Sequence, residues 1–217
     1  MPIEFKNRED AGEKLAKQLN EYKDKEVVVY GLPRGGVVVA SRIADILSKP
    51  LDIISVKKIG HPNQPEFAIA AVTESGLILE NEELVGSIDR DWYENYTRKL
   101  HKEAQERREN YLKGEKMISA KNKTAIIVDD GIATGLTMLA AIEEIKENNP
   151  EKVIVAIPVI PPGIVDTIKK EVDELIALEI PEDYQDSVSA YYQSFPEISD
   201  SEVISFLEKN KNESTKS

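Results

Sequence analysis

Two adjacent aspartates, Asp129 and Asp130, directly follow the apolar run 125–128. A continuous apolar run predicts a buried strand, so both carboxylates are expected at the carboxyl end of a sheet, where open α/β sheets bind ligands. Residues 131–137 (GIATGLT) then mix glycines with threonines ahead of a predicted helix. Backbone amides, hydroxyls and the positive N-terminus of a helix together form a phosphate cradle. An acidic pair that can bind a diol, beside such a cradle, predicts a site for a ribose 5-phosphate group.

Four apolar residues, two acidic residues and a Gly/Thr-rich loop resemble the signature with which type I phosphoribosyltransferases bind phosphoribosyl diphosphate (PRPP). The resemblance implies that Asp129 and Asp130 are catalytic and contact the ribose 2′- and 3′-hydroxyls, partly through Mg²⁺. It implies that the 5-phosphate is held by the next seven residues, Gly131, Ile132, Ala133, Thr134, Gly135, Leu136 and Thr137. The simpler interpretation, an acidic strand end before a capped helix, does not explain why Gly, Thr and paired Asp occur together.

A second loop, residues 32–36 (LPRGG), follows the apolar run 27–30 and precedes another predicted helix. In the family, this is the position of the pyrophosphate loop. Gly35 and Gly36 let the backbone approach a diphosphate, and Arg34 can neutralise it as a third catalytic residue. The resemblance also predicts a cis peptide bond before Arg34. An ordinary turn between strand and helix is the alternative for this loop taken alone.

Two lysines, Lys57 and Lys58, end the apolar run 53–56 and are predicted at the same edge of the sheet. They resemble the basic residues that the family places on the pyrophosphate side. The alternative is that they are solvated, as lysines at strand ends often are.

The order of these motifs, from about Tyr30 to Phe206, resembles a group of predicted phosphoribosyltransferases without a settled substrate. The resemblance implies Mg²⁺-dependent transfer of a phosphoribosyl group from PRPP to a nitrogenous base or similar small-molecule acceptor, with release of pyrophosphate. The alternative is a non-catalytic regulator that binds PRPP or a nucleotide on the same fold. The complete Arg34-Gly35-Gly36 loop favours the enzyme, because a sensor has no need of a leaving-group site.

Two features bear on the acceptor. Enzymes for 6-oxopurines generally carry an aspartate where this chain has Ala133, which weakens a hypoxanthine or guanine assignment. Segment 179–206 takes the place of the family's hood, the part that recognises the acceptor. Its Tyr191, Tyr192 and Phe195 could stack on a flat base or plug the core instead. The hood holds seven acidic residues between Glu179 and Glu202 and no basic one, which favours a neutral or cationic acceptor.

The predicted strands and helices that must position these residues indicate an α/β fold, a mainly parallel sheet flanked by helices. Apolar runs predict strands at 27–30, 53–56, 125–128, 153–157 and 174–178, with a hairpin at 68–79. Helical spacing and capping predict helices that begin after Asn7 and at 37–47, 136–147 and 166–171. The polar tail from Lys209 is expected to fray.

We expect a single domain over residues 1–217, with a helical insertion at 82–118. Its long helix, 89–113, stands where the family carries a flexible lid, and Arg107 and Arg108 are candidates to reach phosphate. The alternative is a solvated helix packed through Trp92 and Tyr96.

Composition sets the outer limits. The 217 residues include 28 Lys and Arg against 40 Asp and Glu, a net charge of −12, which argues against nucleic acid as a partner. There is no cysteine, so disulfides, thiolate nucleophiles and Cys-based metal sites are excluded. The most apolar stretch, 153–165, is short and interrupted by prolines, and residues 1–10 lack the apolar core of a secretion signal. We therefore expect a soluble cytoplasmic protein without membrane contact; its oligomeric state is left open, a homo-oligomer being one alternative.

Overall fold

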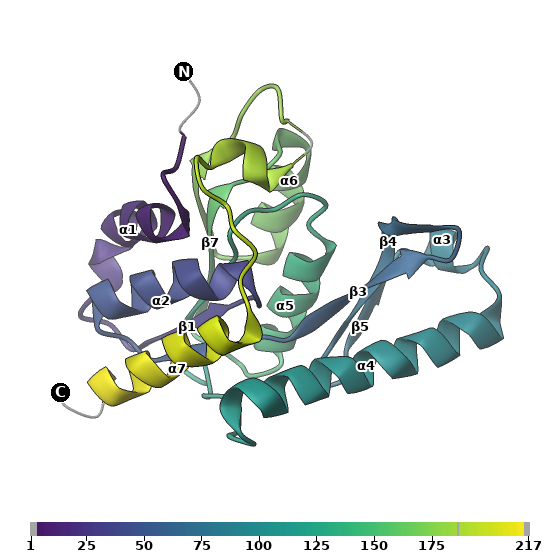
Figure 1. Cartoon of the computed structure of the whole chain (residues 1–217), viewed down its shortest axis with the longest axis horizontal. Helices are drawn as coiled ribbons and strands as arrows, with labels where there is room; N and C mark the ends of the chain where they lie inside the picture. Colours follow the sequence, from purple (N-terminus) through teal and green to yellow (C-terminus); the bar gives the residue numbers. More distant parts are fainter. Residues whose placement is uncertain (1–3, 186, 215–217) are drawn as a thin grey trace.

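The centre of the molecule is a five-stranded sheet in which all neighbouring strands are parallel (Figure 1). The computed structural model describes residues 4–185 and 187–214. In spatial order the strands are β2 (Leu51–Ile53), β1 (Val27–Gly31), β6 (Thr124–Val128), β7 (Lys152–Val159) and β8 (Glu174–Glu179). The predicted mainly parallel sheet flanked by helices is confirmed.

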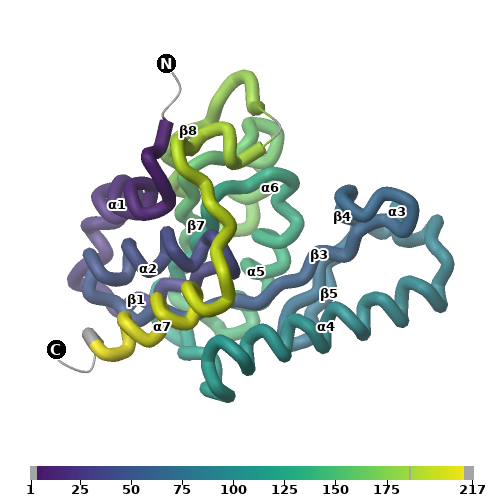
Figure 2. The backbone as a smooth tube through the Cα atoms, in the orientation of Figure 1, coloured from purple at the N-terminus to yellow at the C-terminus, as the bar shows by residue number. Residues whose placement is uncertain are grey.

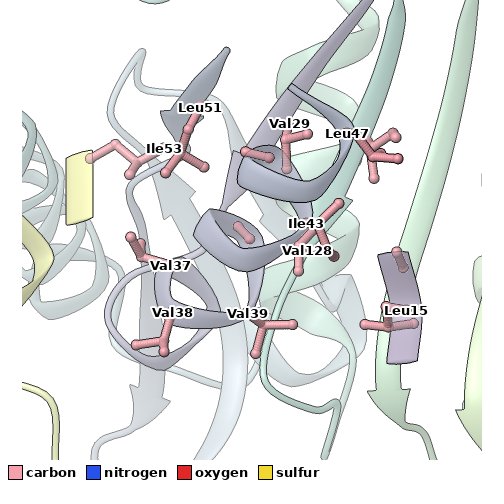
Figure 3. Packing of buried hydrophobic residues seen from close by; sticks show 14 of the residues in the cluster. Leu15, Val29, Val37, Val38, Val39, Ile43, Leu47, Leu51, Ile53 and Val128 are labelled. Atoms are coloured by element: carbon pink, nitrogen blue, oxygen red, sulfur yellow. The ribbon is translucent and has the colours of Figure 1, made fainter. Parts of the chain in front are cut away.

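Helices cover both faces of this sheet. One face carries α1 (Arg8–Gln18), α2 (Gly35–Leu47) and α7 (Asp200–Ser214), and the other carries α5 (Leu136–Lys146) and α6 (Pro162–Glu171). Alternate residues of one strand therefore enter different cores: Val29 packs toward α2 and Val28 toward α5. Figure 3 shows the first core, where Val37 and Ile43 of α2 meet the sheet. Burial on both faces explains why the strands read as unbroken apolar runs.

The predicted strand 53–56 is wrong as a single element. Ile53 ends β2 of the parallel sheet, and Val56 begins β3 (Val56–His61) of a second sheet. That second sheet is antiparallel, with β4 (Gln64–Thr73) between β3 and β5 (Ile78–Glu80). The predicted hairpin 68–79 corresponds to β4 and β5. The break is hidden in the sequence because Ile54 and Ser55 stay buried as the chain passes between the sheets.

Residues 56–112, which we call the arm, project from the parallel sheet (Figure 1). Besides β3, β4 and β5 the arm contains α3 (Glu82–Val85) and the long α4 (Arg90–Leu112), both inside the predicted insertion. It has a small core of its own, formed by Ile59, Ile69, Ala70, Val72 and Leu100. Trp92 stacks on Tyr96 with ring centroids 4.9 Å apart, and Tyr96 packs against this core.

A buried ion pair between Arg108 and Asp52 of β2 joins the arm to the sheet. Arg108 of α4 lies 3.1 Å from the carboxylates of both Asp52 and Glu74, and its side chain is only 12% exposed. The prediction that Arg108 reaches phosphate is therefore wrong, because its guanidinium is used to anchor α4. Burial raises the pKa of Glu74 to about 7, with Arg108 opposing the shift. Close by, the buried Glu144 accepts hydrogen bonds from Thr73 and Ser75.

The first described residues meet the hood (Figure 2). Phe5 N–H donates to Tyr191 O at 2.8 Å, and Gln193 N–H donates to Phe5 O at 2.8 Å. The hood contains a short 3₁₀ helix (Val188–Tyr191), and its last residues, 200–206, form the beginning of α7. Over residues 209–214 the expected fraying is wrong, because α7 continues to Ser214 and buries Asn210, which accepts a hydrogen bond from Leu51 N–H. The rest of the predicted tail, residues 215–217, lies outside the described residues.

Another short 3₁₀ helix, Asn20–Tyr22, follows α1. Throughout the described ranges, every helix is too short or too polar to cross a membrane.

Candidate active site

The two aspartates stand where β6, the middle strand of the parallel sheet, delivers them. Val128 ends the strand, and Asp129 and Asp130 follow at its carboxyl edge. Asp129 accepts a hydrogen bond from the N–H of Asp130 at 2.8 Å, which orients its carboxylate. The Asp130 side chain is only 17% exposed. Two carboxylates thus share a sheltered position at the ligand-binding end of the sheet.

The loop at residues 32–36 packs directly on this pair. The peptide bond between Pro33 and Arg34 is cis, as predicted. A Cβ atom on Gly35 would lie 1.8 Å from Asp130 Oδ2, and one on Gly36 would lie 2.7 Å from Asp129 Oδ1. Only glycine leaves room for this approach, in which each glycine faces an aspartate. That the same backbone approaches a diphosphate stays a prediction.

Arg34 points toward the beginning of α7. Its guanidinium forms an ion pair with Glu197 and lies 3.9 Å from Asp200. It lines a cleft of about 370 Å³. The other lining residues are Lys57, Glu103, Glu106, Arg107, Asn110, Tyr111 and Asp200. Three cations from β3, α4 and the loop therefore gather in a cleft that also holds carboxylates.

The two lysines are separated by the pleat of β3. Lys57 lies in the Arg34 cleft and pairs with Glu103 at 2.9 Å, whereas Lys58 pairs with the exposed Glu66 and is not among the lining residues. The prediction that both end a strand of the main sheet is wrong, since they belong to the antiparallel sheet. The structure brings Lys57, and not Lys58, to Arg34.

The predicted phosphate loop connects β6 to α5. Gly135 has φ = +83°, a conformation that favours glycine, and α5 begins at Leu136. Thr137 lies in the first turn of that helix. Among the described residues, none accepts a hydrogen bond from the backbone N–H of Ala133, Thr134 or Gly135. Ile132 N–H, by contrast, donates inward to Val159 O. The loop thus offers free donors beside a helix N-terminus, which suits an anion.

A residue that the sequence analysis missed holds Asp130. Arg8, the first residue of α1, donates from Nε to Asp130 Oδ2 at 2.7 Å and from Nη1 to Pro196 O at 2.7 Å. Its guanidinium also lies 3.6 Å from the centre of the Phe195 ring. Because 122 positions separate Arg8 from Asp130, no local pattern connects them.

The aromatic side chains of the hood pack against other parts of the protein. Tyr191 and Tyr192 are buried, and the Phe195 ring is covered by Arg8 on one side and lies 4.8 Å from the Tyr192 ring. For Tyr191 and Tyr192 the idea that the rings stack on a flat base is wrong, and the core-plug alternative holds. Phe195 is half-buried and lines a hollow, so for this ring stacking stays a prediction. Tyr192 O–H donates to the backbone oxygen of Asp130 at 2.7 Å, so the hood also contacts the backbone of the acidic motif.

Burial governs the electrostatics of the pair. Burial raises the pKa of Asp129 well above its ordinary value, and the charge of Asp130 adds to the shift. Burial also raises the pKa of Asp130, while the Arg8 guanidinium opposes the shift. Burial and the nearby Asp130 charge raise the pKa of Tyr192, so its phenol remains a hydrogen-bond donor. A ligand cation at the pair would favour the ionised carboxylates.

The donor set fits Mg²⁺ that arrives with a phosphorylated ligand. Asp129 and Asp130 offer carboxylate oxygens, the atoms that Mg²⁺ prefers. Within the part of the chain that the structure describes, no group of three or more His, Asp or Glu side chains is placed to hold a metal by itself. One or two carboxylates plus substrate oxygens and water form a usual magnesium shell.

Comparison with known proteins gives consistent results. Residues 4–192 match the family model described as "Phosphoribosyl transferase domain". Two Mycobacterium tuberculosis proteins, from strains CDC 1551 / Oshkosh and H37Rv, are each named "Putative phosphoribosyl transferase" and are 39% identical to this chain over 207 residues. Those matches cover 94% of this chain and 46% of the relatives, so the chain spans about half of their length.

Solved structures resemble the whole architecture. The protein TT1426 from Thermus thermophilus has a TM-score of 0.81 and 36% sequence identity, over 95% of this chain and 99% of that one. The AQ2163 protein from Aquifex aeolicus has a TM-score of 0.52 and 14% identity, over 82% of this chain and 77% of that one, and shows similarity of fold alone.

Proposed function

Because the chain belongs to the phosphoribosyl transferase domain family, we propose that it transfers the phosphoribosyl group of PRPP to a nitrogenous acceptor. The bond between the anomeric carbon and a pyrophosphate oxygen breaks, and a bond from that carbon to the acceptor nitrogen forms. Pyrophosphate leaves with the electron pair of the broken bond, and the acceptor proton passes to solvent. The observation that carries the proposal is the direct packing of Gly35 and Gly36 on the Asp129–Asp130 pair.

In this proposal the carboxylates of Asp129 and Asp130 accept hydrogen bonds from the ribose hydroxyls. Their negative charge stabilises the positive charge that develops on the ribose as pyrophosphate leaves. Mg²⁺ held at the same two residues supplies charge neutralisation for the phosphorylated substrate when bound. Residues 131–137 hold the 5-phosphate through the N–H donors that face outward beside α5.

The leaving pyrophosphate is neutralised in the cleft of Arg34. Arg34, Lys57 and Arg107 all line it, so the cleft offers three cations to a diphosphate. Lys58, paired with Glu66 away from that cleft, has no part in the proposal. Arg107 belongs to α4, so α4 forms one wall of the cleft. That α4 also moves as a lid stays a prediction.

The acceptor is proposed to lie outside the usual 6-oxopurine class, since Ala133 offers no carboxylate to a purine N7. The acidic hood favours a neutral or cationic nitrogen compound. The buried tyrosines of the hood argue that such an acceptor is held by hydrogen bonds and packing other than stacking on Tyr191 or Tyr192.

The test is incubation with PRPP and Mg²⁺ against a panel of purine, pyrimidine and other nitrogenous acceptors, with pyrophosphate release as the readout. The double variant Asp129→Asn/Asp130→Asn is the control, because it keeps the shape of both side chains and removes their charge. We expect release above that control for at least one acceptor. If the wild type binds PRPP but no acceptor in a broad panel gives release above the control, the non-catalytic regulator is the better description.

A further inference from the structure

Arg8 is a buried cation in a position with no role in the family signature. The residue is only 7% exposed although it is charged. A buried charge is costly unless it is paired and hydrogen-bonded. Arg8 meets both conditions through Asp130 and Pro196, and the face of Phe195 adds a favourable contact for the cation.

The two hydrogen bonds of Arg8 join three distant parts of the chain. The guanidinium reaches from the first turn of α1 to the acidic pair, and from there to the hood segment 195–197. A planar guanidinium can serve two acceptors in fixed directions, which a lysine ammonium on a flexible stem cannot do in the same way. Arg8 therefore fixes the distance between the acidic pair and the hood, in addition to placing a positive charge beside Asp130.

Asp130 is held from two sides. Gly35 packs against its carboxylate, and a Cβ on Gly35 would also lie 2.7 Å from Arg8 Nε. Both Arg8 and Arg34 line a hollow of about 340 Å³. Its other lining residues are Gly35, Phe195, Pro196, Glu197 and Ile198. The hollow thus connects the loop that carries Arg34 with the hood, and Arg8 lies between them.

We propose that Arg8 is a positioning residue of the phosphoribosyl site, holding the Asp130 carboxylate and hood segment 195–197 in one arrangement. This inference rests on the proposed function. It makes α1 part of the active site, in addition to its role in covering the sheet. Without the guanidinium, Asp130 loses its only ion-pair partner among the described residues, and segment 195–197 loses its bond to the motif.

The test compares Arg8→Ala with Arg42→Ala by calorimetric titration of PRPP in the presence of Mg²⁺. Arg42 is a matched control, since it also joins α1 to another element, through Glu13 at 2.7 Å, but stands away from the aspartates. We expect Arg8→Ala to weaken PRPP binding at least tenfold and Arg42→Ala to stay within twofold of the wild type. Added methylguanidinium should restore binding to Arg8→Ala and have no effect on Arg42→Ala, which a merely structural loss would not show.

Arg8→Lys separates charge from geometry and covers the case in which Arg8→Ala does not fold. It keeps a cation near Asp130 but cannot reproduce both fixed bonds, so we expect binding three- to tenfold weaker than wild type. PRPP binding by Arg8→Lys equal to the wild type overturns the inference. So does a folded Arg8→Ala that binds normally, or one that methylguanidinium does not rescue.

A double-mutant cycle keeps this test distinct from that of the proposed function. If the wild type binds no PRPP, the proposed function fails, and the unfolding equilibria of Arg8→Ala, Asp130→Asn and the double variant still test the contact. We expect the two substitutions to be coupled by at least tenfold in the unfolding equilibrium constant. Additive effects of the two substitutions overturn the inference.

Discussion

Gly35 is the residue where packing and chemistry depend on each other most closely. A methyl group there would occupy the position of the Asp130 carboxylate and press on Arg8. Both neighbours are buried and bonded, so neither can move without losing a partner. We predict that Gly35→Ala lowers kcat/KM for PRPP at least 100-fold, equivalent to about 2.7 kcal/mol, because Asp130 is displaced.

Gly163→Ala is the control for that substitution, because nothing lies within 4 Å of the added Cβ. It should leave steady-state kinetics unchanged and should not lower the temperature of thermal unfolding, since alanine is favoured over glycine in a helix. Wild-type kcat/KM in Gly35→Ala would contradict the packing of the loop on the acidic pair.

Arg34 is held in the free protein by a carboxylate where a phosphate is expected. Glu197 is 81% exposed, so the pair is worth about 0.2–1 kcal/mol. Glu197→Gln releases Arg34, and we predict that pyrophosphate then binds about two- to fivefold more tightly by calorimetric titration.

The matched control is Glu208→Gln, which removes the same charge from α7 at a pair with Lys113. It should leave the affinity for pyrophosphate unchanged. Equal tightening in both variants would indicate an effect of net charge alone, and weaker binding in Glu197→Gln would show that the carboxylate helps to hold the ligand.

At the scale of elements, the joint between the arm and the sheet contains a titratable group. The pKa of Glu74 is raised from 4.5 to about 7 by burial, with the charges of Asp52 and Glu144 adding and Arg108 opposing. The folded protein thus binds this proton more tightly than the unfolded chain does. Protonation of Glu74 therefore adds to the free energy of unfolding. This contribution is complete below about pH 4.5 and is lost as the pH rises to about 7, an effect of up to about 3 kcal/mol.

Urea unfolding between pH 4.5 and 8 measures this effect. We predict that the free energy of unfolding declines more steeply with pH in the wild type than in Glu74→Gln, with the difference levelling above pH 7. Glu66→Gln, an exposed carboxylate on β4, should keep the wild-type dependence. Parallel pH profiles of the wild type and Glu74→Gln would contradict the shift.

The sequence predicts elements well where their signals are local. The strand before Asp129 and the loop through Gly135 follow from contiguous residues, and the cis bond before Arg34 was expected from the resemblance to the family. The break between β2 and β3 was missed because the run through Ile54 stays buried across it. Helix α7 was missed altogether, because its stability comes from contacts of Val203, Leu207 and Asn210 with the rest of the protein.

Side-chain partners were the least predictable part of the site. Lys57 and Lys58 are neighbours in sequence, yet the pleat of β3 sends only Lys57 to Arg34. Arg108 looks like one more charge on a polar helix until Asp52 and Glu74 are brought to it. Arg8 finds Asp130 only through the fold. Such pairs form only when the fold brings distant residues together, so neither the spacing of residues nor the composition predicts them.

At the scale of the whole molecule, the hydrophobic cores of the parallel sheet and of the arm differ in size. The parallel sheet is enclosed by extensive clusters on both faces, whereas the arm has five fully buried apolar residues of its own. We predict that backbone amides of β3 and of residues 64–70 in β4 exchange with deuterium at least tenfold faster than those of β6 and β7. Hydrogen exchange with mass spectrometry measures this difference, and equal protection would show that the arm opens only with the sheet.

The reach of Arg8 has a consequence for the order of events during synthesis. Its two bonds connect residues 122 and 188 positions apart. A growing chain that has already emerged beyond β6 still lacks the hood carbonyl to which this guanidinium donates. The sheet can therefore be completed, with β8 ending at Glu179, before the proposed site is, because Arg8 gains its second bond only when residues near Pro196 are free to dock.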